Sequence, residues 1–215
     1  MNIEGWPKKY KPAVWQLDFV HKYIEQPKAK SLLVAAPGTG KTITALYAAH
    51  LMREQKTIDA LIVLNDYAAL REQWKYVASE VGFNLSDSIE QYREGEHDGV
   101  SLTVQSLNDT KRVDDLMSLS SGSTCFGIVD ESHRTNKRIN EIVSKVLDSN
   151  VNNKFLFISG TAALTHDMFD EEYRFDSEYI FQDSVLKAPA TKIEIAHFSP
   201  SFSRSSKADK QKCPN

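Results

Sequence analysis

The chain has 215 residues, which fits one large domain or two small ones and leaves room for a sizeable hydrophobic core. Hydrophobic residues make up 41% and charged residues 26%, and the net charge of −3 excludes a generally basic protein that coats nucleic acid. Any nucleic-acid site must therefore be a local patch. The two cysteines make no disulfide framework, and no apolar run is long enough to cross a membrane, so we expect an intracellular protein.

The predicted elements begin with a helix over residues 13–25, which has Pro12 in front of it. From residue 31 onward, apolar and β-branched runs alternate with helix-like segments. The predicted strands are Ser31–Ala36, Ala60–Asn65, Val100–Val104, Cys125–Asp130, Lys154–Ser159 and Thr191–His197. The predicted helices that follow are Thr42–Gln55, Ala68–Val81, Ser106–Leu119 and Asn136–Ser149, and residues 82–99 read as a loop or a short edge insertion. This alternation predicts an α/β fold with a doubly wound, mostly parallel sheet.

A glycine-rich run, Ala35–Thr42, lies between the first of these strands and the helix after it. That strand–loop–helix context is what a phosphate-binding loop requires, because glycines let backbone N–H groups turn toward phosphates at a helix N-terminus. We expect Lys41 to reach the β- and γ-phosphates and the Thr42 hydroxyl to bind Mg²⁺. Ala35 replaces the usual first glycine, at a position that needs no unusual backbone angle. The residues expected to hold the nucleotide here are Gly38, Thr39, Gly40, Lys41 and Thr42.

Two acidic residues, Asp130 and Glu131, end the apolar run of residues 126–129. Open α/β sheets bind ligands at the carboxyl ends of their strands. In an ATPase this is the place for a carboxylate that holds Mg²⁺, here Asp130, followed by one that activates the attacking water, here Glu131. Acidic residues also cap helices, so the pair alone leaves a purely structural role open. The phosphate loop upstream favours the catalytic interpretation.

In this order along the chain, several segments resemble the first motor domain of superfamily-two helicases and translocases of the DExH type. The phosphate loop matches motif I, residues 130–133 match motif II, and residues 159–162 match motif III. The resemblance implies a P-loop NTPase of RecA-like fold that uses ATP and Mg²⁺. It implies that the catalytic residues are Lys41, Asp130 and Glu131. The residues implied to couple the nucleotide site to nucleic acid are His133, Ser159 and Thr161.

Other resemblances are looser. Gln16 matches an upstream glutamine that reads adenine in this family, since an amide offers one donor and one acceptor. Residues 64–74 resemble motif Ia and residues 103–107 resemble motif Ib, both of which run along the nucleic-acid backbone in this family. An ordinary helix face with Trp74 in the core stays open as the alternative for the first of these. The residues implied to contact nucleic acid are Arg71, Gln73, Gln105 and Ser106.

The implied partner is DNA, with RNA as an alternative, and Arg134-Thr135 after motif II is similar to restriction-enzyme motor subunits. A complete motor of this family has a second RecA-like domain with motifs IV to VI, and nothing in the sequence matches them. The resemblance therefore implies half a motor, of low activity alone, that needs a second domain in trans or in a longer parent chain. The alternative is a non-motor ATP-binding regulatory module, or a truncated copy, that acts with a partner. The expected parts are an N-terminal segment over residues 1–30, an ATP-binding domain over 31–198, and a polar tail or linker over 199–215.

Overall fold

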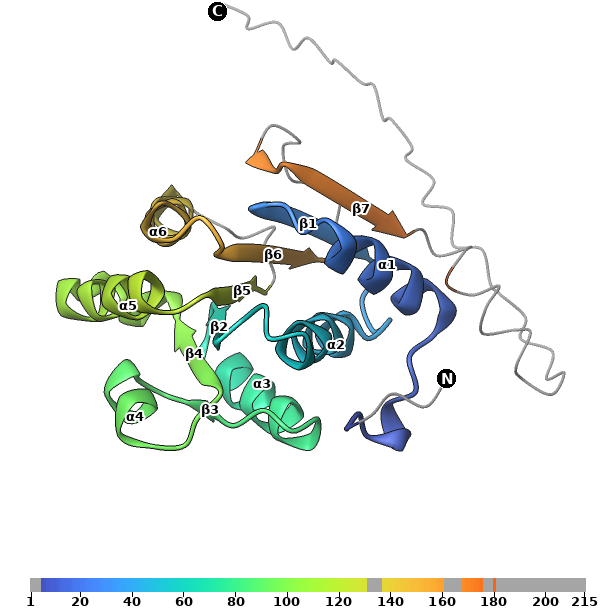
Figure 1. Cartoon of the computed structure of the whole chain (residues 1–215), viewed down its shortest axis with the longest axis horizontal. Helices are drawn as coiled ribbons and strands as arrows, with labels where there is room; N and C mark the ends of the chain where they lie inside the picture. Colours follow the sequence, from blue (N-terminus) through green and yellow to red (C-terminus); the bar gives the residue numbers. More distant parts are fainter. Residues whose placement is uncertain (1–4, 131–136, 161–167, 176–179, 181–215) are drawn as a thin grey trace, which may run out of the picture.

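The computed structural model describes residues 5–130, 137–160, 168–175 and 180. Within these residues one seven-stranded sheet has the order β3-β4-β2-β5-β6-β1-β7, and every strand pairing is parallel (Figure 1). The strands are β1 Lys30–Ala35, β2 Ala60–Asn65, β3 Leu85–Ser86, β4 Gly99–Thr103, β5 Cys125–Val129, β6 Lys154–Ser159 and β7 Glu171–Phe175. The α-helices are α1 Val14–Glu25, α2 Lys41–Glu54, α3 Ala68–Glu80, α4 Ile89–Glu94, α5 Thr110–Gly122 and α6 Lys137–Ser149.

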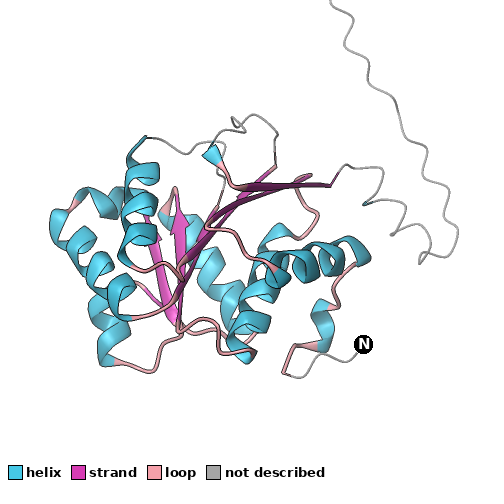
Figure 2. Ribbon diagram, turned by 45° about the horizontal axis from the view of Figure 1, so that its top comes forward, coloured by secondary structure: helices cyan, strands magenta, loops and turns pink. Residues whose placement is uncertain are grey.

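Both faces of the sheet are covered by helices, as Figure 2 shows. Successive residues of a strand point to opposite faces, so Leu33 packs into the cluster formed with α1, α2 and α3, while Leu32 packs into the cluster formed with α4, α5 and α6. Burial on both faces explains why the strands read as continuous apolar runs without polar alternation. The predicted doubly wound parallel sheet is confirmed.

Parallel strands place all their carboxyl ends at one edge of the sheet. The phosphate-loop strand β1 lies between β6 and β7, and β5 lies between β2 and β6. Ala36, Asp130 and Gly160, which directly follow β1, β5 and β6, therefore lie at this edge, which is where open α/β sheets bind ligands.

Five of the six predicted strands are confirmed to within one residue at each end, and Thr191–His197 lies outside the described residues. The prediction missed β7, whose sequence Glu171–Phe175 is mostly polar. An edge strand needs few apolar side chains, and β7 uses Tyr173 and Phe175, whose rings lie 5.0 Å from Phe19 and 5.2 Å from Trp15.

The helix predicted to begin at Ser106 begins at Thr110 instead, and this prediction was wrong by one turn. A 3₁₀-helix, η2, occupies Val104–Asn108, and Asp109 then caps α5 by accepting a hydrogen bond of 3.0 Å from the backbone N–H of Lys111. Residues 82–99 hold β3 and the short α4 at the sheet edge, as expected of an edge insertion.

Cys125 is a free, buried thiol at the start of β5, and burial raises the pKa of this thiol to about 12. It is a buried residue of the core cluster that also holds Leu32. Among the helices of the described residues, none combines the length and apolar character that crossing a membrane requires.

Candidate functional site

The phosphate loop joins β1 to α2 and turns through two glycines. Gly38 and Gly40 have φ values of 77° and 89°, in the left-handed region that glycine adopts without a Cβ penalty. A Cβ on Gly40 would also lie 2.9 Å from Nε2 of Gln16, so close packing is a second reason for glycine there. The Thr39 hydroxyl donates to the Ala36 carbonyl at 2.7 Å and closes the loop. Gly40 is the N-cap of the 14-residue α2, so the positive end of this helix lies at the loop.

Lys41 holds its ammonium inside this loop. Its Nζ donates hydrogen bonds to the carbonyl oxygens of Ala35 and Ala36, at 2.9 and 3.0 Å. These contacts place the positive charge at the carboxyl end of β1, close to the helix N-terminus that also favours anions. The loop is thus arranged as a site for a multiply charged anion.

A pocket of about 390 Å³ opens beside the loop at the carboxyl edge of the sheet. It brings together Lys41, Thr42 and Asp130, which were predicted from separate motifs. Residues from the loop, from α3 and from the ends of β5 and β6 form its wall: Pro37, Gly38, Gly40, Lys41, Thr42, Leu70, Gln73, Trp74, Asp130 and Ile158.

Asp130 follows β5 directly. Its backbone N–H donates to the Leu64 carbonyl at 3.1 Å, which continues the pairing of β5 with β2. Its carboxylate Oδ2 accepts a hydrogen bond of 2.7 Å from the indole Nε1 of Trp74. Glu131 and His133, the other predicted residues of this motif, lie outside the described residues.

The oxygen donors of this pocket fit Mg²⁺. The ion prefers oxygen ligands, and proteins usually hold it through one or two carboxylates together with substrate phosphates. The Asp130 carboxylate and the Thr42 hydroxyl line the same pocket as the phosphate loop. In the part of the chain that the structure describes, no three or more histidine, cysteine, aspartate or glutamate side chains gather as an all-protein metal site. Thr42 and Asp130 are the described residues that would hold the ion here.

Motif III packs directly against the phosphate loop. Ser159 ends β6, is fully buried and pairs with Val34 of β1. A Cβ on Gly160 would lie 3.2 Å from Cγ of Pro37 and 3.8 Å from Nζ of Lys41. Gly160 therefore lies against the phosphate loop, while Thr161 lies outside the described residues.

Gln16 ties α1 to the phosphate loop. Its side chain is 7% exposed, and its Oε1 accepts a hydrogen bond of 2.8 Å from the backbone N–H of Ala13. Its Nε2 donates to the Gly40 carbonyl at 3.2 Å and to the Thr44 hydroxyl at 2.9 Å. Adenine reading by Gln16 requires these bonds to be exchanged for bonds with the base, and it stays a prediction.

Replacing Gln16 with alanine is expected to weaken the binding of ATP and GTP by a similar factor, about tenfold for the loss of two hydrogen bonds that support the loop. The measurement is titration of each nucleotide by calorimetry. Gln26→Ala, an exposed amide at the end of the same helix, is the control. A loss of affinity for ATP but not for GTP would contradict a role of Gln16 in supporting the phosphate loop, and it would support adenine reading.

The predicted nucleic-acid contacts lie on α3 and η2, which follow strands β2 and β4. These two strands are neighbours in the sheet, and Asn65 pairs with Thr103, so their carboxyl ends lie side by side. Gln105 is exposed on η2. The Ser106 hydroxyl donates to the Thr103 carbonyl at 2.6 Å, so it stabilises the turn.

Arg71 lies 2.9 Å from Glu72 and 3.6 Å from Asp87, so its charge is partly balanced. Gln73 lines the pocket beside the phosphate loop.

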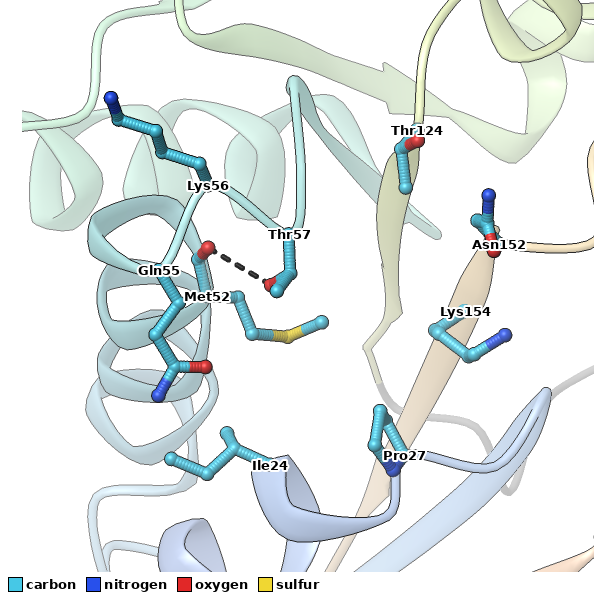
Figure 3. A pocket seen from close by; sticks show the side chains of 9 residues that line it. All are labelled: Ile24, Pro27, Met52, Gln55, Lys56, Thr57, Thr124, Asn152 and Lys154. Atoms are coloured by element: carbon cyan, nitrogen blue, oxygen red, sulfur yellow. Dashed lines mark hydrogen bonds between the residues drawn. The ribbon is translucent and has the colours of Figure 1, made fainter.

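A second pocket, of about 450 Å³, lies at the opposite edge of the sheet, where strands begin. Figure 3 shows that its two lysines, Lys56 and Lys154, point outward from it in different directions. Nζ of Lys154 donates to the carbonyls of Val151 and Asn153, at 2.9 and 3.3 Å. Because its charged groups do not converge, this pocket is not the candidate site.

This chain is similar to a known protein family and to several solved structures. The family model described as "Type III restriction enzyme, res subunit" matches residues 9–164. Among solved structures, the UvsW helicase of bacteriophage T4 superposes with a TM-score of 0.59 at 19% identity, over 76% of this chain and 60% of that one. The Hef helicase domain of Pyrococcus furiosus gives a TM-score of 0.60 at 16% identity, over 80% of this chain and 40% of that one.

A third similar structure is a nuclease-deletion mutant of the Type ISP restriction-modification enzyme LlaGI in complex with a DNA substrate mimic. Its TM-score is 0.57 at 15% identity, over 83% of this chain and 21% of that one. The predicted RecA-like fold is confirmed by these likenesses. This chain spans at most 60% of the length of each of the three structures. Comparison with curated proteins finds no match.

Proposed function

Because this chain belongs to the family of Type III restriction enzyme res subunits, we propose that it is the ATP-binding first motor domain of a DNA helicase or translocase. The observation that carries the proposal is that one pocket is lined both by the phosphate-loop residues Lys41 and Thr42 and by Asp130. An intracellular location is part of the proposal, because DNA and ATP are both found there.

The residues of the proposed site have different roles in ATP hydrolysis. The backbone N–H groups of the loop and the Lys41 ammonium bind the phosphates and offset their charge. Thr42 and Asp130 would hold Mg²⁺, which would supply further positive charge to offset that of the phosphates. Glu131, next in the chain after Asp130, takes a proton from the attacking water. Gln16 braces the loop from α1.

The proposed nucleic-acid contacts are Arg71, Gln73, Gln105 and Ser106, and the proposed coupling residues are His133, Ser159 and Thr161. The packing of Gly160 against Pro37 supports the coupling role, since it joins motif III to the phosphate loop. The DNA mimic bound to the similar LlaGI structure supports DNA as the partner. A second RecA-like domain, in trans or in a longer parent chain, would supply arginine fingers, so we propose low activity for this chain by itself. The proposed parts of the chain are an N-terminal segment over residues 1–30, an ATP-binding domain over 31–198 and a polar tail or linker over 199–215.

The test is steady-state ATP hydrolysis by the purified chain, with and without single- and double-stranded DNA and RNA. The expected result is slow, Mg²⁺-dependent hydrolysis that DNA stimulates and that Lys41→Ala removes. Lys145→Ala, an exposed lysine on α6, is the matched control. ATP binding without any stimulated hydrolysis would contradict the motor and favour a non-motor regulatory module.

Arg71→Ala is expected to lower DNA affinity a few-fold and by the same factor for unrelated sequences, because contacts to phosphates carry no sequence information. Glu72 and Asp87 would then lose a basic neighbour, which strengthens the repulsion of DNA. The measurement is fluorescence anisotropy with labelled oligonucleotides at two salt concentrations, and affinity should fall steeply with salt. Arg112→Ala, exposed on α5, is the control. Tight binding that does not depend on salt concentration and that differs between DNA sequences would contradict contact with the DNA phosphate backbone.

A further inference from the structure

Trp74 is a core residue that also lines the nucleotide pocket. It lies on α3, is 1% exposed and packs in the cluster beneath α1, α2 and α3. Its indole ring is therefore held by the core packing around it. The interpretation of Trp74 as a core residue is confirmed. The indole N–H of this residue also makes a hydrogen bond in the pocket.

The indole N–H of Trp74 donates to Oδ2 of Asp130 at 2.7 Å. Hydrogen bonds to a carboxylate are stronger than those between neutral groups, and this one is shielded from water on the indole side. The Asp130 backbone is held as well, through its N–H bond to Leu64. With one oxygen held by a rigid ring, the carboxylate cannot turn about its terminal torsion without breaking this bond.

We propose that Trp74 is a positioning residue, which holds the Asp130 carboxylate in the orientation that binds nucleotide-associated Mg²⁺. This inference rests on the proposed function, in which Asp130 is a ligand of the ion. A residue that holds a metal ligand by hydrogen bonding sets the direction and basicity of that ligand, and its loss commonly weakens metal binding by about 10–100-fold. Trp74 acts through Asp130 and touches no reacting atom.

The test uses Trp74→Phe, which keeps an aromatic ring in the core and removes the N–H donor. ADP affinity is measured by calorimetry with excess Mg²⁺ and with EDTA. We expect the gain in affinity that Mg²⁺ confers to fall by about tenfold, while affinity in EDTA stays the same. Trp15→Phe is the matched control, since Trp15 is also 1% exposed in the same cluster. It is expected to leave both affinities unchanged.

A double-mutant cycle with Asp130→Asn separates positioning from packing. If Trp74 acts through the carboxylate, then adding Trp74→Phe to Asp130→Asn changes the Mg²⁺ dependence no further. An undiminished Mg²⁺ effect in Trp74→Phe, or equal losses with Mg²⁺ and with EDTA, overturns the proposal and leaves Trp74 as a packing residue.

A measurement on the unaltered chain covers the case in which Trp74→Phe does not fold. The protein has three tryptophans, so indole-labelled protein gives three N–H resonances by NMR. The Asp130→Asn variant, together with Trp6→Phe and Trp15→Phe, identifies the resonance of Trp74. We expect this resonance to shift when Mg²⁺ is added to the ADP complex, and its constancy would overturn the proposal. Failure of ADP to bind at all would instead contradict the proposed function.

Discussion

Lys41→Ala is expected to abolish the rise in thermal midpoint that ATP and Mg²⁺ produce in the unaltered chain. A ligand that binds only the folded state stabilises it by about 2.7 kcal/mol at a concentration 100 times its Kd. For a chain of this size that corresponds to a shift of about 5–10 °C. The Lys41 ammonium is bonded to two carbonyls at the end of β1, at the mouth of the phosphate loop. Its removal takes away the side-chain charge that offsets the phosphates.

The measurement is a thermal melt with and without ATP and Mg²⁺. The midpoint without nucleotide should hardly change, because Lys41 begins α2 and alanine is a strong helix former. Lys145→Ala on α6 serves as the control and should keep the full shift. An equal shift in Lys41→Ala would contradict the assignment of the loop.

Glu131→Gln is expected to keep ATP binding and to lose hydrolysis by about 10²–10⁴-fold, the range that a positioned general base contributes. The amide nearly matches the carboxylate in shape but is a poor base. Nucleotide binding should persist, because the loop residues and Asp130 that line the pocket are unchanged.

The experiment compares phosphate release and the ATP-induced thermal shift in the same preparations. Glu25→Gln, at the exposed end of α1, is the control. Unchanged turnover in Glu131→Gln would mean that another base operates or that the activity belongs to a contaminant.

The fold class and the phosphate loop of this protein could be recognised from residue patterns alone. A strand buried on both faces needs a continuous apolar run, and such runs placed β1, β2, β4, β5 and β6 correctly. The loop before α2 could be recognised because its conformation depends on neighbouring residues, above all on the glycines at 38 and 40 with positive φ. Asp130 could be placed at the sheet edge because it ends a recognisable strand.

How separate segments of the chain meet could not be predicted from these patterns and became visible in the folded protein. Trp74 and Asp130 lie 56 positions apart, and their hydrogen bond depends on how α3 packs against the sheet. The engagement of Gln16 with Gly40, the presence of Gln73 in the pocket and the pairing of β7 with β1 have the same origin. Local patterns record which face of an element is apolar. They carry no information on which side chain of a distant element that face will meet, because packing of the whole core selects it.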